Sequence, residues 1–102
     1  MAHITISQEV RKDLQSIHEY ISNELCNPDA AQRMIKEIKR SILRLQDLPE
    51  CGRPLDALLS VHTEYRYLVC EGYCIFYLAS SQEALVVRIL NQRQDYIRAL
   101  FM

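Results

Sequence analysis

The residues of this sequence that could take part in chemistry are arginines and tyrosines near the end of the chain. Three arginines, Arg66, Arg88 and Arg93, lie in or directly after the most strand-like part of the chain, and Tyr96 follows them. A guanidinium group can hold a phosphate through two parallel hydrogen bonds, and a tyrosine ring can stack on a base. These residues could therefore clamp a phosphate. In the alternative, Arg66 and Arg88 form ordinary salt bridges, since an arginine within a strand needs solvent or a partner.

No established catalytic motif accompanies these arginines. The chain contains no HExxH, P-loop, GxSxG or GxGxxG sequence, so the enzyme classes that these motifs mark have no support. Its three histidines are scattered singly, and we interpret them as surface or packing residues: His3, His18 and His62. The four cysteines show no CxxC spacing, so we interpret them as reduced thiols that pack as small apolar residues. We therefore expect no metal site and no cofactor.

Length and composition fit one small globular domain. The 102 residues are 49% hydrophobic and 25% charged, with a net charge of −1, and no linker divides them, so we expect a single domain over residues 1–102. The near-neutral charge disfavours a protein that binds nucleic acid through a broad basic surface. No apolar run approaches the roughly 20 residues of a membrane span. We therefore expect a cytoplasmic protein that does not act on membranes.

The elements that must position the arginines are strands. Residues 65–70 and 73–78 are aromatic and β-branched runs separated by Glu71 and Gly72, which is a hairpin signal because Gly supplies the positive φ of a tight connection. A third run covers residues 84–90. Connections this short require antiparallel neighbours, so the sequence predicts a meander. Residues 2–6 alternate enough to form a further, N-terminal strand.

Two amphipathic helices precede the meander. Apolar residues at spacings of three and four predict one helix from Gln8 to about Leu25, capped by Ser7, and another that starts at Asn27-Pro28 and runs to about Leu48. Their short joint predicts an antiparallel helix hairpin. Residues 49–54 then break the helix, residues 55–63 are irregular or a short helical turn, and residues 97–102 form a terminal turn or short helix.

These elements predict an α+β domain in which an N-terminal strand and an antiparallel helix hairpin accompany an antiparallel β-meander, with a short C-terminal helical turn. The helix hairpin covers one sheet face. The other face is then the available surface, and we expect the arginines and tyrosines from the end of the chain to gather there.

Three pieces of the sequence, in this order after the helices, carry a resemblance to a known family. They read PECGRP at residues 49–54, YRYLVCEGYCIFY at residues 65–77 and VRILNQRQDY at residues 87–96. Together they resemble the RelE/ParE superfamily of toxins from bacterial type II toxin–antitoxin modules, over nearly the whole chain. The resemblance implies a small α+β toxin that a cognate antitoxin neutralises by wrapping its surface.

The superfamily implies two mechanisms. ParE-like members poison DNA gyrase, and no residue is then catalytic. RelE-like members are metal-independent endoribonucleases that cut messenger RNA in the ribosomal A site; here Arg66, Arg88 and Arg93 would clamp phosphate and Tyr96 would act on the attacking hydroxyl. In RelE-like proteins a catalytic arginine follows the hairpin glycine and tyrosine, whereas this chain has Cys74.

The departure at Cys74 favours the ParE-like branch, because a thiol cannot supply the fixed positive charge that a dianionic transition state needs. RelE-like cleavage remains the alternative. A third hypothesis is an inactive relative that still binds an antitoxin. The apolar end of the chain suggests where an antitoxin would bind, and we expect Ile97, Leu100 and Phe101 to contact it, with a further antitoxin strand at the meander edge.

Overall fold

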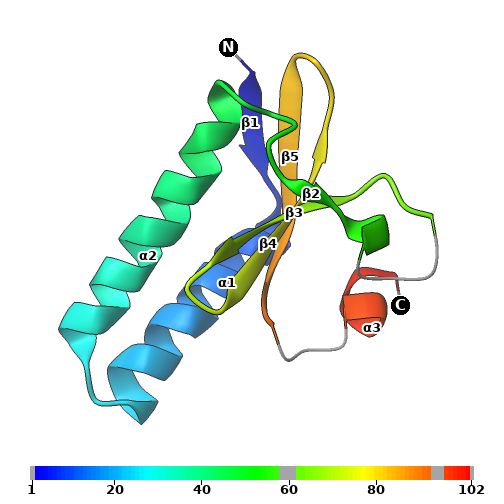
Figure 1. Ribbon diagram of the computed structural model, residues 1–102. Helices are drawn as coiled ribbons and strands as arrows, with labels where there is room; N and C mark the ends of the chain where they lie inside the picture. Colours follow the sequence, from blue (N-terminus) through cyan, green and yellow to red (C-terminus); the bar gives the residue numbers. More distant parts are fainter. Residues whose placement is uncertain (1, 58–61, 93–95, 102) are drawn as a thin grey trace.

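The computed structural model describes residues 2–57, 62–92 and 96–101, with the backbone alone at residues 96 and 97. Within these residues the chain forms five strands, two long helices and a short C-terminal helix, joined by single helical turns (Figure 1). The elements in chain order are β1 (His3–Ile6), α1 (Gln8–Glu19), η1 (Tyr20–Glu24), α2 (Pro28–Leu43), η2 (Arg44–Gln46), β2 (Arg53–Pro54), η3 (Leu55–Ala57), β3 (Arg66–Cys70), β4 (Tyr73–Ala79), β5 (Glu83–Asn91) and α3 (Tyr96–Phe101).

The strands form one mixed sheet in the order β1-β5-β4-β3-β2. Strands β3, β4 and β5 are the predicted antiparallel meander, and Glu71 and Gly72 at the first turn both have positive φ, 47° and 92°. The N-terminal strand is also confirmed, and it pairs with β5 in parallel. A parallel neighbour needs a long crossover, which the rest of the chain supplies. The α+β fold class is therefore confirmed.

The sequence did not predict strand β2. Its two residues, Arg53 and Pro54, pair with Tyr67 and Arg66 at the start of β3. The prolines and glycine of this segment exclude a helix, as expected, but an edge position tolerates a proline because its missing N–H can face away from the sheet. The short helical turn predicted after it is η3, and residues 58–61 of the same predicted segment lie outside the described residues.

The two helices begin where the capping residues predict. The Ser7 side chain accepts a hydrogen bond from the backbone N–H of Val10, and the Asn27 side chain accepts one from Ala30, with Pro28 in the first turn of α2. Both α-helices end before their predicted limits, since α1 continues as the π-helical turn η1 and α2 as the 3-10 turn η2. Apolar residues of both helices are buried against the sheet as predicted: Val10, Ile17, Ile21, Ala31, Ile38 and Ile42.

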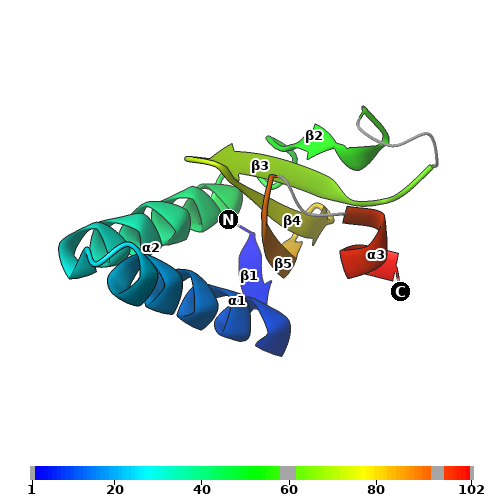
Figure 2. The same ribbon diagram turned by 90° about the horizontal axis from the view of Figure 1, so that it is seen from below.

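The helix hairpin and the sheet enclose the main core. Figure 2 shows α1 and α2 side by side in one layer, with α3 apart from them at the other end of the sheet. The sheet residues that face the helices include Cys70, Ile75, Tyr77, Val86 and Ile89, all buried. One face of the sheet is thus closed by the helices, as the sequence predicts.

The other face of the sheet is not bare, which corrects the expectation from sequence. A second cluster buries Tyr67, Cys74, Phe76 and Leu90 together with Leu55 of η3. Partly buried residues pack against it from β5, from the segment before β3 and from the C-terminal helix: Tyr65, Val87, Ala99 and Leu100. Residues of α3 and η3 therefore cover part of this face.

Candidate functional site

Arg66 lies at the start of β3, on the face of the sheet that the helices cover. It pairs across the strands with Tyr77, and directly opposite residues project to the same face. Its guanidinium donates hydrogen bonds to the carbonyl oxygens of Gly52 at 2.8 Å and Glu50 at 3.3 Å. Arg66 therefore holds the helix-breaking segment against the sheet.

Arg88 lies opposite Phe76 in β5, on the side of the second cluster, beside a register shift in the β4–β5 ladder. Its Nε and NH2 donate to the two carboxylate oxygens of Asp13 in α1 at 2.9 and 3.0 Å, and the backbone N–H of Ile89 donates to Asp13 at 2.9 Å. Another Arg88 nitrogen donates to the carbonyl of Ala99 in α3 at 3.5 Å. Hydrogen bonding to Asp13 raises the pKa of Arg88 above its ordinary value. Arg88 thus ties α1, β5 and α3 together.

The structure does not bring the two arginines together. Phe76 and Tyr77 are consecutive in β4, so their cross-strand partners Arg88 and Arg66 project to opposite faces of the sheet. The expectation that both gather on one uncovered face is wrong. Arg93 lies outside the described residues, and so does the side chain of Tyr96, whose backbone begins α3. Arg88 forms a salt bridge with Asp13, which is one of the two alternatives that the sequence left open.

Cys74, which the resemblance places where RelE-like proteins carry an arginine, is 2% exposed. It belongs to the second cluster with Phe76 and Leu90. A small apolar side chain suits that place, whereas burial of a charged one there would be costly. Cys70 is also buried, whereas Cys26 and Cys51 are exposed free thiols.

The C-terminal helix carries the residues expected to meet an antitoxin. Leu100 is partly buried against the second cluster, and the ring of Phe101 meets the edge of Tyr65 at a centroid distance of 5.6 Å while remaining 47% exposed. The side chain of Ile97 lies outside the described residues. The end of the chain is therefore docked on its own sheet and still presents one aromatic side chain to solvent.

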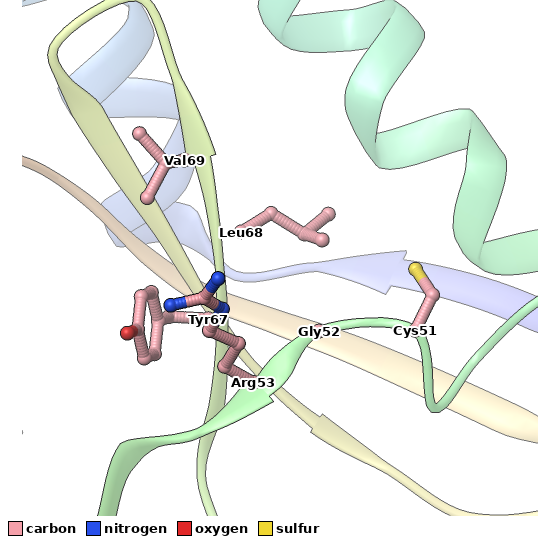
Figure 3. A pocket seen from close by; sticks show the side chains of 6 residues that line it. All are labelled: Cys51, Gly52, Arg53, Tyr67, Leu68 and Val69. Carbon is pink, nitrogen blue, oxygen red and sulfur yellow. The ribbon is translucent and has the colours of Figure 1, made fainter. Parts of the chain in front are cut away.

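A hollow of about 320 Å³ lies beside this region, at the outer edge of β3. Figure 3 shows its lining side chains, which come from the helix-breaking segment and from β3: Cys51, Gly52, Arg53, Tyr67, Leu68 and Val69. Strand β2 pairs only with the first two residues of β3, so β3 beyond Tyr67 has no neighbour on this side among the described strands. An unpaired strand edge next to a hollow is suited to an extended peptide.

Sequence reasoning missed two residues that organise this part of the molecule. Gly52 donates its backbone N–H to the hydroxyl of Tyr77 at 2.8 Å, and a Cβ on Gly52 would lie 2.5 Å from that oxygen. Burial raises the pKa of the Tyr77 phenol, so it stays protonated. Gly52 therefore allows its segment to approach Tyr77 closely. The sequence alone does not reveal this requirement, because it depends on which residues meet in the folded protein. The sequence also does not single out Asp13 as the partner of Arg88, because Asp13 is one of several charged residues on α1.

Asp56 of η3 and His62 form an exposed pair. His62 Nδ1 lies 2.9 Å from Asp56 Oδ2, and the Thr63 N–H donates to Asp56 Oδ1 at 2.7 Å. The carboxylate raises the pKa of His62, and the hydrogen bond from Thr63 lowers the pKa of Asp56. The described residues contain no group of three or more His, Cys, Asp or Glu side chains placed to hold a metal ion. No helix within the described residues is both long enough and apolar enough to cross a membrane.

Comparison with known proteins decides the family. The family model of the ParE toxin of the type II toxin–antitoxin system parDE matches residues 4–96. The chain belongs to the ParE toxin family. This membership confirms the superfamily resemblance and makes the chain a toxin of a type II toxin–antitoxin system. A search of curated proteins gives no significant match.

Several solved structures share this fold. A chain of the chromosomal ParDE toxin–antitoxin system of P. aeruginosa superposes with a TM-score of 0.74 at 21% identity, covering 89% of this chain and 96% of that one. YafQ of E. coli superposes with a TM-score of 0.56 at 20% identity over the full length of both chains. A chain of the E. coli DinJ–YafQ complex gives a TM-score of 0.55 at 15% identity, again over both full lengths.

Proposed function

We propose that this ParE-family toxin acts by binding DNA gyrase in the cytoplasm and stalling it, without a catalytic residue of its own. The observation that carries the proposal is the family match together with the burial of Cys74 at the place of the RelE-like arginine. Loss of one preorganised charge costs a transition state about 3 kcal/mol, or more than a hundredfold in rate.

Arg66 and Arg88, the two candidate arginines whose side chains the structure describes, are both engaged in other contacts. Arg66 donates to backbone carbonyls on the helix-covered side, and Arg88 is held by both oxygens of Asp13 on the other side. To stabilise the transition state of RNA cleavage, cationic side chains must converge on the scissile phosphate. Arg66 and Arg88 thus make structural contacts. This supports a toxin that binds a target protein over one that cleaves RNA.

Regulated expression in a bacterial host tests the proposal. We expect DNA-damage signalling and stalled gyrase to precede any loss of translation. Codon-phased cuts in messenger RNA, with gyrase unaffected, would support RelE-like cleavage instead. Unaffected growth in cells that accumulate folded protein would support an inactive antitoxin-binding relative.

The proposal includes a cognate antitoxin as the partner. The similar structures come from a ParDE toxin–antitoxin system and a DinJ–YafQ complex, and the chain belongs to the same kind of system. We place part of the antitoxin contact on α3, where Phe101 is 47% exposed beside the partly buried Leu100, with Ile97 on the same helix. The unpaired edge of β3 and its hollow adjoin the region that α3 covers.

A matched pair of variants tests this placement. Phe101→Ala should weaken binding of the protein encoded by the adjacent reading frame by about tenfold, because a half-exposed aromatic ring loses its contact area. Tyr20→Ala is the control, since Tyr20 is 53% exposed at the far end of the helix hairpin. Binding that survives deletion of residues 97–102 unchanged would show that α3 is not part of the interface.

A further inference from the structure

The outer side of α2 carries a row of exposed cationic side chains. We call this row the α2 ridge, and its members are Arg33, Lys36, Arg40 and Arg44. Arg44 begins η2, but its backbone keeps right-handed helical angles, φ −60° and ψ −24°, so it continues the line of the helix. Residues three and four positions apart lie on one face of a helix, and the buried Ile38 and Ile42 lie on the opposite face. Figure 1 shows α2 along one border of the molecule, so the α2 ridge faces outward.

The α2 ridge is a local concentration of positive charge on a nearly neutral molecule. The segment from Pro28 to Arg44 contains five basic and two acidic side chains, a net charge of +3, whereas the whole chain carries −1. One of the two carboxylates, Glu37, lies 2.8 Å from Arg40, but the Arg40 side chain is still 62% exposed. An exposed ion pair contributes at most about 1 kcal/mol, so Arg40 can exchange Glu37 for another anion.

The length and polarity of the α2 ridge fit the backbone of duplex DNA. From Arg33 to Arg44 the helix axis advances by about 16 Å, and one DNA strand presents about five phosphates over that length. A hollow of about 370 Å³ adjoins the ridge, and every described residue that lines it is polar: Asp29, Gln32, Arg33 and Lys36. Protein-binding surfaces have an apolar centre depleted in lysine, whereas DNA-binding surfaces are polar and cationic. The composition of the ridge therefore favours DNA over an acidic protein.

We propose that the α2 ridge binds the phosphate backbone of duplex DNA while the toxin is bound to gyrase. This inference rests on the proposed action on gyrase, and it adds that DNA is part of the target. The ridge is short, and Asp29 and the net charge of −1 oppose an approaching phosphate, so a free duplex is bound only weakly. The contact with gyrase supplies the remaining affinity. The toxin consequently prefers gyrase that already holds DNA.

The affinity of the toxin for gyrase, measured with and without a bound duplex at one salt concentration, tests the inference. We expect the duplex to tighten binding by about tenfold or more. The double variant Lys36→Gln, Arg44→Gln should lose most of this increase and keep its affinity for DNA-free gyrase. The matched control is Arg11→Gln, Lys12→Gln, which removes two exposed charges from α1 and should keep the increase. Circular dichroism of each variant shows that it is folded.

Three outcomes of this titration are informative. Equal affinity for gyrase with and without DNA would overturn the inference and leave the proposed function standing. Weaker binding of the α2 double variant to DNA-free gyrase, with no effect of DNA, would also overturn it, because an acidic protein surface would then occupy the α2 ridge. Failure to bind gyrase in either state would overturn the proposed function and the inference together.

Binding to a free duplex at low salt gives a test that does not depend on gyrase. Four phosphate contacts predict that the logarithm of the association constant falls with the logarithm of salt concentration with a slope of about −3 to −4. The α2 double variant should reduce the magnitude of the slope by about 2, and the α1 control should not change it. Binding that does not depend on salt, or tighter binding to an RNA duplex of equal length, would overturn the inference. So would association of the toxin with itself that the α2 double variant abolishes, because a second copy would then cover the ridge.

Discussion

Gly52→Ala should destabilise the fold more than a surface glycine substitution, because the new methyl has no room. An ideal Cβ would lie 2.5 Å from Tyr77 Oη, 2.7 Å from Tyr77 Cε1 and 2.9 Å from the Tyr67 carbonyl oxygen. Tyr77 is fully buried, so neither its ring nor the β3 backbone can move freely. Overpacking costs about 1–3 kcal/mol, and weakening the Gly52–Tyr77 hydrogen bond adds about 1 kcal/mol. We expect a loss of about 2–4 kcal/mol in the free energy of unfolding.

Urea unfolding followed by circular dichroism measures this cost. Tyr77→Phe removes the nearest atom, so Gly52→Ala should cost at least about 0.5 kcal/mol less in the Tyr77→Phe background. Gly72→Ala separates the two roles of glycine: no atom lies within 4 Å of its added Cβ, and its φ of 92° is the source of strain. That variant should cost about 1 kcal/mol regardless of Tyr77. A Gly52→Ala cost below about 0.5 kcal/mol would show that the fold accommodates the added methyl group.

Three further predictions concern the ion pairs and the thiols. Asp13→Asn should lower the free energy of unfolding by about 2 kcal/mol, because it leaves Arg88 and a backbone N–H poorly paired; Glu24→Gln is the control, and equal costs would contradict the role of Asp13. An NMR titration should give His62 a pKa above 6.5, and Asp56→Asn should return it toward that value. Because the folded-state pKa of His62 is raised, the stability that protonated His62 contributes is complete below pH 6.5 and is lost as the pH rises through that folded-state pKa. Because the folded-state pKa of Asp56 is lowered, the stability that ionised Asp56 contributes is present above pH 3.8 and is lost on acidification. A His62 pKa at or below 6.5 would show that the pair does not form. Thiol titration of the native protein should detect two cysteines, Cys26 and Cys51, and unfolding should reveal the buried two, Cys70 and Cys74.

Periodicity and capping chemistry predicted the elements that are stabilised locally. Both helix starts follow from a side-chain cap, and the β3–β4 hairpin follows from a turn that needs positive φ. The helix ends were less predictable. A π-helical and a 3-10 turn continue the same apolar stripes with other hydrogen bonds, and a pattern of residue types does not distinguish them.

Sheet edges and the second cluster escaped prediction because they depend on contacts between distant residues. Strand β2 is two residues long and contains a proline, so it has no signature of its own. The facing of Arg66 and Arg88 depends on strand register, and residues one position apart face opposite sides. Arg88 binds Asp13, which lies 75 residues away in the sequence. The candidate site could therefore be named from sequence by residue type, but its geometry could not.

We propose that this ParE-family toxin acts on gyrase by binding and not on RNA by catalysis. The most direct test adds the purified chain to purified gyrase with relaxed plasmid and, in parallel, to ribosomes translating a defined messenger RNA. We expect the chain to inhibit supercoiling in proportion to its molar ratio to gyrase, the antitoxin to reverse this inhibition, and the messenger RNA to stay intact. Messenger RNA cut in the ribosomal A site, with supercoiling unchanged at a molar excess of the chain, would contradict this proposal.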